Sequence, residues 1–453
     1  MFTVVANSWA LLLGMMLLMV GNGLQGTLLG VRGGAEGFSP LEMSIVMSGY
    51  FVGFLGGSRL TPELIRRVGH VRVFAALGSF ISAVMVLYPT FLDPTAWTVG
   101  RIVMGFCFSG VYVTAESWLN NSTTNETRGQ TLSVYMIVQM LGIVGAQGLM
   151  LIPDASGFAL FVLASVLVSV SFAPILLSIS PTPAFEATKP MSLRQILKAS
   201  PLGCVGMFLL GGVFSAQFGM AAVYGTEAGL SVAQISLFVA MFYIGATVVQ
   251  YPLGWLSDRM DRRLLILIAS VIGGVGAALA MTMGGNYPML LTGAFLIGGM
   301  SNPLYSLLIA YTNDFLAHED MAAASGGMVF INGLGAIAGP LITGWIMGML
   351  GAPGYFVIIG VLLFALAGYA GWRMTRRPAR PVTETSHYAP VHPTSSMVTV
   401  ELAQEYAMDA AQGDAGADGD GAGGQTGGQA GGQPPARAAA PRPDPDADPE
   451  LAE

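Results

Sequence analysis

Long apolar stretches follow one another along the chain, separated by short polar links. The twelve stretches cover residues 11–29, 45–60, 71–88, 97–118, 131–152, 158–179, 202–224, 235–256, 264–283, 289–311, 326–350 and 355–372. Each is about as long as the ~20 residues that a helix needs to cross a hydrocarbon core of about 30 Å. The pattern predicts an all-α integral membrane protein with twelve transmembrane helices.

Positive charge is confined to alternate links. Of the chain's 19 Lys and Arg residues, all except Arg32 and Arg101 lie on the even-numbered links, at the stretch ends that flank those links, or after the last stretch. Lys and Arg are retained on the cytoplasmic side of a bilayer, so we expect both termini in the cytoplasm. Termini on one side require an even number of spans, which agrees with the count of twelve. We expect a multi-pass protein of a bacterial inner membrane.

Composition excludes a soluble globular chain, because 53% of the residues are hydrophobic and only 10% are charged. The net charge of −7 comes from the end of the chain, residues 379–453, which is rich in Gly, Pro, Asp and Glu. Such a segment buries too little apolar surface to fold, so we expect a disordered, acidic cytoplasmic tail with a short helix at 398–411 as its one candidate element.

The longest internal link, residues 180–200, divides the stretches into two sets of six, in residues 1–179 and 201–378. Sequence features recur between the two sets at an offset of 192 or 193 residues. The matching features are Gly37-Phe38-Ser39 with Gly229-Leu230-Ser231, Gly53 with Gly245, Gly105 with Gly298, and Gly142 with Gly335. The series predicts two pseudo-symmetric six-helix bundles, with 180–200 as a cytoplasmic linker.

The sharpest local motif lies between the eighth and ninth stretches, and reads Gly254-Trp-Leu-Ser-Asp258-Arg259-Met-Asp261-Arg262-Arg263. We expect a tight turn at the glycine and a helix N-terminus capped by Asp258. The arginines would pair with acids or with C-terminal carbonyls of adjoining helices. Such a cluster would hold cytoplasmic helix ends together in one state and release them in another. Arg128 and Asp314 are further candidates for this gate.

This motif closely resembles the signature loop of the major facilitator superfamily. Arg101-Ile-Val-Met-Gly105 is similar to the superfamily's fourth-helix motif, and the stretches 116–120, 125–129, 250–254 and 333–340 resemble a bacterial branch, the YcaD-like transporters. The resemblance covers residues 1–378. It implies alternating access, with the first, fourth, seventh and tenth spans lining a central cavity.

The corresponding loop of the first half departs from this pattern. Pro62 stands in place of the motif's glycine and Arg66 in place of its aspartate. The charge latch of the first half is therefore in doubt, with Glu63 as the candidate replacement.

Two ionisable residues lie inside the fourth stretch, where charge is costly and usually faces the interior of a bundle. Glu116 follows Arg101 by 15 positions, which is about 22 Å along a helix with a difference in direction of about 60°. Both side chains can therefore face one cavity without touching. They are candidates for handling solute or protons; the alternative is that each makes a structural pair with a neighbouring helix.

Neutral polar residues complete the candidate pathway. On the presumed cavity helices they are Asn22, Gln25, Tyr112, Gln217, Tyr224, Asn302 and Tyr305, and Gln139 and Asn332 occupy corresponding places on the fifth and eleventh stretches. Each either binds a ligand by hydrogen bonding or joins two helices.

The motifs of enzymes, nucleotide binding and metal binding are missing from the sequence, so we expect no enzyme, no cofactor and no metal site. The interpretation is a monomeric secondary active transporter of a small solute, with the lipid bilayer as its surroundings, protons as the candidate coupling ion and no nucleic-acid partner. The alternative is a non-transporting sensor or scaffold that signals through the acidic tail.

Overall fold

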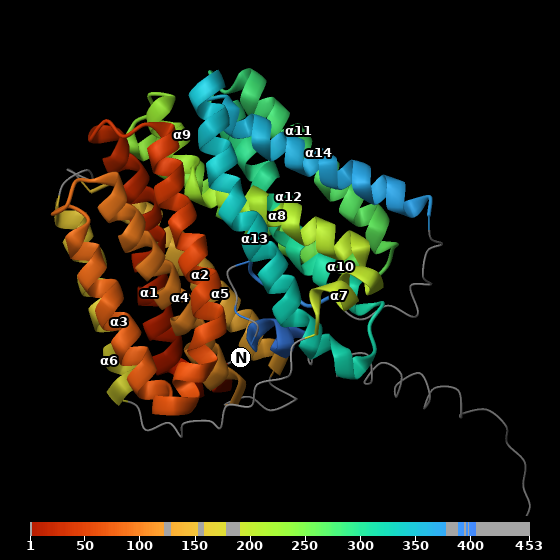
Figure 1. The fold of residues 1–453 in the computed structure, drawn as a ribbon, viewed down its shortest axis with the longest axis horizontal. Coiled ribbons are helices and arrows are strands. Elements are labelled where there is room, and N and C mark those ends of the chain that lie inside the picture. Colours follow the sequence, from red (N-terminus) through yellow and green to blue (C-terminus); the bar gives the residue numbers. More distant parts are fainter. Residues whose placement is uncertain are drawn as a thin grey trace, which may run out of the picture. The chain divides into compact units, whose positions relative to one another are not determined.

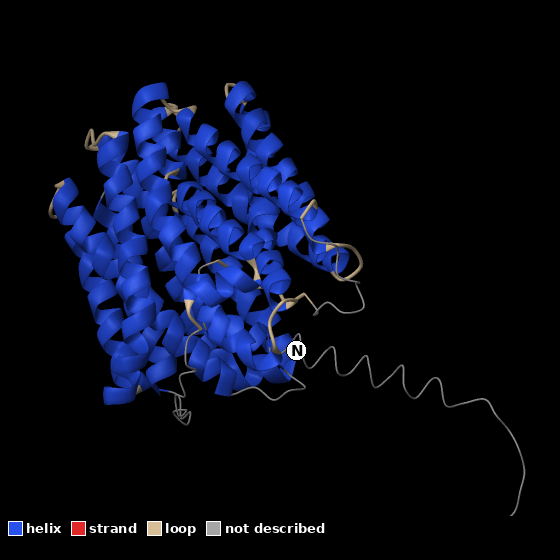
Figure 2. Cartoon of the chain, turned by 45° about the vertical axis from the view of Figure 1, so that its right-hand side comes forward, coloured by secondary structure: helices blue, strands red, loops and turns tan. Residues whose placement is uncertain are grey.

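The computed structural model describes residues 2–121, 128–152, 158–177, 191–376, 388–393, 396 and 398–404. All regular elements in these residues are helices (Figure 2). They include α1 (Phe2–Ala35), α2 (Pro40–Val68), α3 (His70–Leu87), α4 (Pro94–Asn121), α5 (Arg128–Leu149), α6 (Phe158–Leu177), α7 (Leu193–Ala199), α8 (Pro201–Gly219), α9 (Ala221–Glu227), α10 (Val232–Ser257), α11 (Arg262–Met283), α12 (Tyr287–Asn313), α13 (His318–Leu350) and α14 (Gly354–Met374).

Ten of these helices are long and apolar enough to cross a membrane. The other two that match predicted stretches are α2, whose many Gly and Ser residues lower its hydropathy, and α6, whose apolar part is the shorter Phe158–Pro174. The seventh stretch differs from the prediction of one continuous helix. It is divided into α8 and α9 at Met220, the residue that ends the first and precedes the second.

The same helix pairings recur in both halves of the chain. In the first half α2 packs on α4, α1 on α5 and α6, and α3 on α4 and α6. In the second half α10 packs on α12, α8 on α13 and α14, and α11 on α12 and α14. Helices α1 to α6 therefore correspond in order to α8, α10, α11, α12, α13 and α14.

Corresponding turns are also built alike. Gly37 and Gly229 have φ values of 79° and 71°, a left-handed conformation that glycine adopts without a steric penalty. Two residues later Ser39 caps the N-terminus of α2 and Ser231 caps that of α10, each through a reciprocal capping box with the residue three positions further along. The repeat seen in the sequence is thus a repeated way of ending one helix and starting the next.

Repeated glycines also mark the closest helix crossings. A Cβ on Gly53 or Gly105 would lie 1.8 Å from a backbone carbonyl oxygen across the α2–α4 crossing. Gly245 and Gly298 are equally constrained where α10 crosses α12, with 2.2 Å and 2.1 Å to the facing carbonyl oxygens. These positions need glycine because the two backbones touch.

The two halves are in direct contact along α2 and α13, and a further segment lies between them at one end of the helices. We call the end that carries the turn between α10 and α11 the basic end. At the opposite end α2 lies directly on α13: a Cβ on Gly344 would be 2.3 Å from the Cβ of Ser44, and the Ser48 hydroxyl donates to the Ile337 carbonyl at 2.7 Å. At the basic end, the described residues 388–393, 396 and 398–404 of the blue C-terminal segment lie between the halves (Figure 1).

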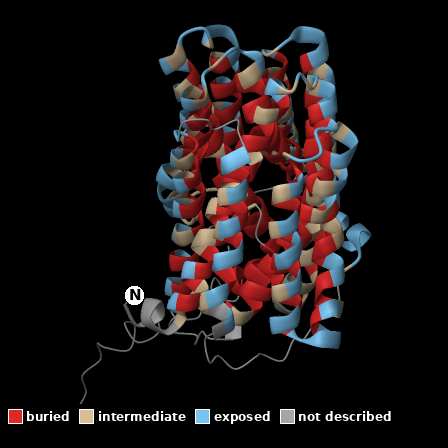
Figure 3. Ribbon diagram, turned by 90° about the vertical axis from the view of Figure 1, so that its left-hand side faces the viewer, coloured by how far each residue is buried: buried red, intermediate tan, exposed pale blue. Residues whose placement is uncertain are grey.

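Burial follows this arrangement, with buried residues concentrated between the helices and exposed ones along their outer faces (Figure 3). Many exposed side chains are large and apolar, including Tyr251, Trp255 and Trp345. Such a surface fits a hydrocarbon environment better than water.

Candidate functional site

A cavity of about 120 Å³ lies between the two halves near the middle of the helices. The first half lines it with polar residues of α1, α4 and α5: Asn22, Gln25, Arg101 and Gln147. The second half contributes mainly aromatic side chains from α8 and α10, together with Asn332 of α13. Aromatic side chains come from both halves, since Tyr50, Phe51 and Phe54 of α2 also line the cavity, whereas most of its polar groups belong to the first half.

Arg101 is the only charged side chain among the described residues that line this cavity, and it is 4% exposed. Its guanidinium donates to Gln25 Oε1 at 2.8 Å and lies 4.8 Å from the centre of the Tyr50 ring. The network continues from Gln25 to Asn22 at 3.3 Å, and from Asn22 to the Tyr112 hydroxyl at 3.0 Å. Helices α1, α2 and α4 thus hold Arg101 in one orientation.

Arg101 has no carboxylate within ion-pair distance among the described residues, and its buried Nε has no hydrogen-bond partner there. Burying a cation without a counter-charge costs several kcal/mol, and the cation–π contact with Tyr50 offsets only about 2 kcal/mol of that. The arrangement is therefore suited to a ligand that brings a negative or strongly accepting group.

Glu116 lies in a different environment from Arg101, and it is not among the residues that line the cavity. It is buried near the basic end of α4 and accepts a hydrogen bond from Tyr135 of α5 at 3.0 Å. The backbone N–H of Ser396 donates to the same carboxylate at 3.1 Å, and the Ser396 hydroxyl donates as well.

The remaining predicted pathway residues divide into three groups. Asn22, Gln25 and Asn332 line the central cavity. Tyr112 does not line it, but its hydroxyl accepts the hydrogen bond from Asn22. Asn302 lines a second, larger pocket of about 700 Å³ between α5 and α10. The others are buried away from both pockets: Gln139 in α5, Gln217 beside Ser301, Tyr224 stacked on Tyr355, and Tyr305 against Phe214.

Several cavity residues were not predicted. Tyr50, Gln147 and Tyr243 lie on stretches that were not expected to line the cavity, although the polar Gln147 inside an apolar stretch was an available signal. His392 and Pro393 also line the cavity, and they come from the segment that composition assigns to a disordered tail.

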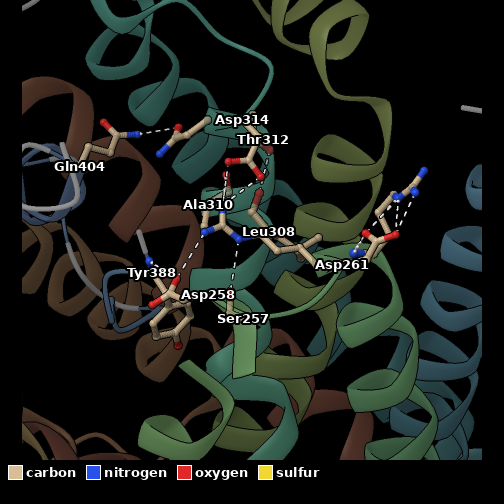
Figure 4. Close-up of polar contacts among 12 residues, drawn as sticks. Ser257, Asp258, Asp261, Leu308, Ala310, Thr312, Asp314, Tyr388 and Gln404 are labelled. Atoms are coloured by element: carbon tan, nitrogen blue, oxygen red, sulfur yellow. Dashed lines mark hydrogen bonds and ion pairs between the residues drawn. The ribbon is translucent and has the colours of Figure 1, made fainter. Parts of the chain in front are cut away.

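The turn between α10 and α11 forms a buried charge cluster at the basic end (Figure 4). Arg262 donates to both carboxylate oxygens of Asp314 on α12, at 2.7 and 2.9 Å, and to the Ala310 carbonyl at 3.3 Å. The Arg262 side chain also donates to Ser257 at 3.2 Å and lies 3.6 Å from Asp258. Arg262 therefore joins the ends of α10, α11 and α12.

Three details of the motif differ from the expectation. Gly254 is not in a tight turn but in the last turn of α10, where its missing side chain makes room for the Tyr388 ring. Asp258 does not begin a helix but ends α10, and it accepts the Tyr388 N–H at 2.8 Å. Asp261 is the residue that caps α11, and it also binds the Arg263 guanidinium.

The other candidate gate residues are local or not described. Arg259, in the turn after α10, donates to the Trp255 carbonyl and lies over the Trp255 ring. The side chain of Arg128 lies outside the described residues. In the first half, Glu63 binds Arg66 and Arg67 of its own helix on an exposed face, a geometry that joins no two helices.

Comparison with known proteins agrees with this architecture. The family model described as Major Facilitator Superfamily matches residues 11–227 and 202–402. An uncharacterised MFS-type transporter YcaD from Escherichia coli O7:K1 is 25% identical over 363 residues, which are 78% of this chain and 92% of that protein.

Solved structures with a similar fold include the nucleoside transporter NupG, with a TM-score of 0.66 and 13% identity over 82% of this chain and 99% of that one. A bacterial homologue of the human lysosomal transporter Spinster, in an inward-facing and unoccupied conformation, has a TM-score of 0.61 and 13% identity over 89% of this chain and 98% of that one. From the family match over both halves we conclude that the chain belongs to the Major Facilitator Superfamily and is a multi-pass membrane transporter.

Proposed function

We propose that the chain is a secondary active transporter that moves a small solute across the bacterial inner membrane by alternating access. The helices α1–α6, α8 and α10–α14 are its twelve spans, with the short α9 completing the seventh, and the basic end faces the cytoplasm. The corresponding helix pairings support two bundles that rock around a shared cavity. The distribution of Lys and Arg supports the orientation.

The observation that carries the proposal is Arg101, a buried cation that has no carboxylate partner among the described residues and is aimed at a cavity between the two halves. A solute with a carboxylate, a phosphate or a comparable acceptor would supply the missing partner through charge-assisted hydrogen bonds. The aromatic wall from α8 and α10 would take the apolar part of the same solute.

Glu116 is our candidate for proton coupling, because a buried carboxylate beside Tyr135 has both a site for a proton and a hydrogen-bond partner. The variant Glu116→Gln keeps the shape and the acceptor oxygen but cannot exchange a proton. If that variant moves solute with an unchanged pH dependence, Glu116 does not carry the coupling proton.

The test of the binding site is a thermal-shift screen of the purified protein with small carboxylates, organic phosphates, sugars and nucleosides. A ligand at 100 times its Kd stabilises the folded state by about 2.7 kcal/mol. We expect acidic ligands to raise the melting temperature of the wild type but not of Arg101→Gln. The control is Arg32→Gln, which removes a cation paired with Glu36 at the opposite end.

Ligands found in this way are then tested for uptake into proteoliposomes with and without an imposed pH gradient. Uptake of an acidic ligand by the wild type and its loss in Arg101→Gln would support the proposal. Equal binding of uncharged ligands to the wild type and Arg101→Gln, with no response to acids, would contradict the assignment of Arg101.

A further inference from the structure

The segment that lies between the halves at the basic end comprises the described residues 388–393, 396 and 398–404, and we call it the docked segment. Composition assigns it to a tail that should not fold, yet most of its side chains are buried. Val391, Val400 and Leu402 are all inaccessible to solvent or nearly so. A segment that only followed the last helix would not bury its apolar side chains in this way.

The first part of the docked segment binds the second half of the protein. The Tyr388 N–H donates to Asp258 at 2.8 Å, and Gln250 of α10 donates to the Tyr388 hydroxyl at 3.1 Å. Val391 makes a reciprocal pair with the Ser306 hydroxyl of α12, at 2.9 Å from its N–H and 3.1 Å to its carbonyl.

The later part reaches across to the first half and back. Ser396 binds Glu116 of α4 through its N–H and its hydroxyl. Gln404 donates to Asn313 of α12 at 3.0 Å and accepts from Ser325 of α13 at 2.8 Å. The docked segment therefore connects both halves at the basic end.

The docked segment also borders both pockets. His392 and Pro393 are part of the wall of the central cavity, and Tyr388, Val391 and His392 are part of the wall between α5 and α10. A solute entering from the basic end would have to pass the space that these residues fill.

Two residues singled out by the sequence take on a second role at this site. Gly254 leaves the space for the Tyr388 ring, since a Cβ there would lie 2.7 Å from two ring carbons. Asp258 accepts the Tyr388 N–H instead of capping a helix. The end of α10 and the turn between α10 and α11 thus bind the docked segment as well as the neighbouring helix ends.

We propose that the docked segment is an intramolecular plug, which closes the route from the basic end to the central cavity and must leave before the cavity is accessible from that side. Rocking of the halves changes the separation of Glu116 from Asp258 and Asn313, so the plug also holds the halves in the arrangement described here. The role in transport rests on the proposed function, but the closure of the route does not.

The test measures access to the cavity and needs no substrate. Gly26 lines the central cavity, and a Cβ there meets nothing within 4 Å, so a cysteine fits. The two native cysteines, Cys107 and Cys204, are buried and are replaced by alanine in the background. The full-length Gly26→Cys protein is reconstituted in vesicles, and labelling by a water-soluble maleimide is followed from the basic side.

The plug is released by Val400→Asp, which places a carboxylate at a fully buried position. The matched control is Val382→Asp, the same substitution outside the described residues. We expect slow labelling in the parent and the control, and labelling at least about tenfold faster in Val400→Asp, as for a shift in a two-state equilibrium. Gly254→Leu, which displaces Tyr388 without changing the segment, should act in the same direction.

A synthetic peptide of residues 388–404 should restore protection to Val400→Asp, and a scrambled peptide should not. Equal labelling rates in the parent, Val400→Asp and Gly254→Leu, whether fast or slow, would overturn the plug. If the plug is confirmed but no solute is ever transported, the proposed function fails while the closure stands.

Discussion

Removing the carboxylate of Asp314 is the most direct test of the charge cluster at the basic end. The side chains of Arg262 and Asp314 are 2% and 3% exposed, so water cannot replace the lost partner in Asp314→Ala. Breaking a buried pair by removing one member costs about 3–5 kcal/mol. Asp258 lies 3.6 Å from Arg262 and partly compensates for the missing carboxylate. We therefore expect Asp314→Ala to lower the free energy of unfolding by about 3 kcal/mol.

For a cooperative unit of the size of one half, a loss of about 3 kcal/mol lowers the melting temperature by roughly 6–12 °C. Unfolding is followed by the reaction of a thiol-specific dye with the buried Cys107 and Cys204, one in each half. Replacing both partners, in Arg262→Met with Asp314→Leu, should restore most of the loss, because no buried charge is left unpaired.

The matched control lies in the degenerate loop of the first half. Glu63 is 42% exposed and binds only arginines of its own helix among the described residues, so Glu63→Ala should leave the melting temperature unchanged. The reasoning is refuted if Asp314→Ala melts within 2 °C of the wild type, an outcome far below the expected shift. It is also refuted if Glu63→Ala is as damaging as Asp314→Ala.

Two further predictions use other parts of the molecule. Gly105→Ala should lower stability by about 1–3 kcal/mol, because its Cβ would collide with a carbonyl oxygen 1.8 Å away. Gly145→Ala, whose Cβ would meet nothing within 4 Å, should raise stability by about 0.5–1 kcal/mol. Equal changes in melting temperature for the two variants would contradict this. Burial lowers the pKa of His392 from 6.5 to about 4, so docking should be fully stable above pH 6.5 and weaken by up to tenfold per pH unit as the pH falls toward 4. Hydrogen exchange of the docked segment at pH 5 and pH 7 measures this loss of docking stability. His392→Gln should remove the part of the pH dependence that comes from His392. Equal exchange rates in the wild type and His392→Gln at pH 5 would contradict the prediction.

The helical architecture could be predicted because membrane helices are governed by length and hydropathy, and because the halves repeat local features. Gly37 and Gly229 were matched by spacing alone, and both prove to be left-handed turn residues. The break at Met220 could not be predicted, since the residues on both sides are equally apolar and hydropathy does not report where a helix bends.

The candidate site was only partly predictable. Arg101 was found because a charge in an apolar stretch is costly, so its position carries information by itself. The partner of Glu116 was not found, because Ser396 lies 280 residues away in a segment of polar composition. Composition reports whether a segment can fold alone, and the docked segment instead uses the apolar walls of the helices.

The contact of α2 with α13 at the opposite end has a consequence for how this protein could be trapped. The seam there includes the small residues Ser44, Ser48 and Gly344, which bring the two backbones close together, and a hydrogen bond from Ser48 to Ile337 crosses it. A tryptophan in place of Gly344 would act as a wedge in that seam. It would force the two halves apart at that end and give binders raised against that face a shape that differs from the arrangement described here.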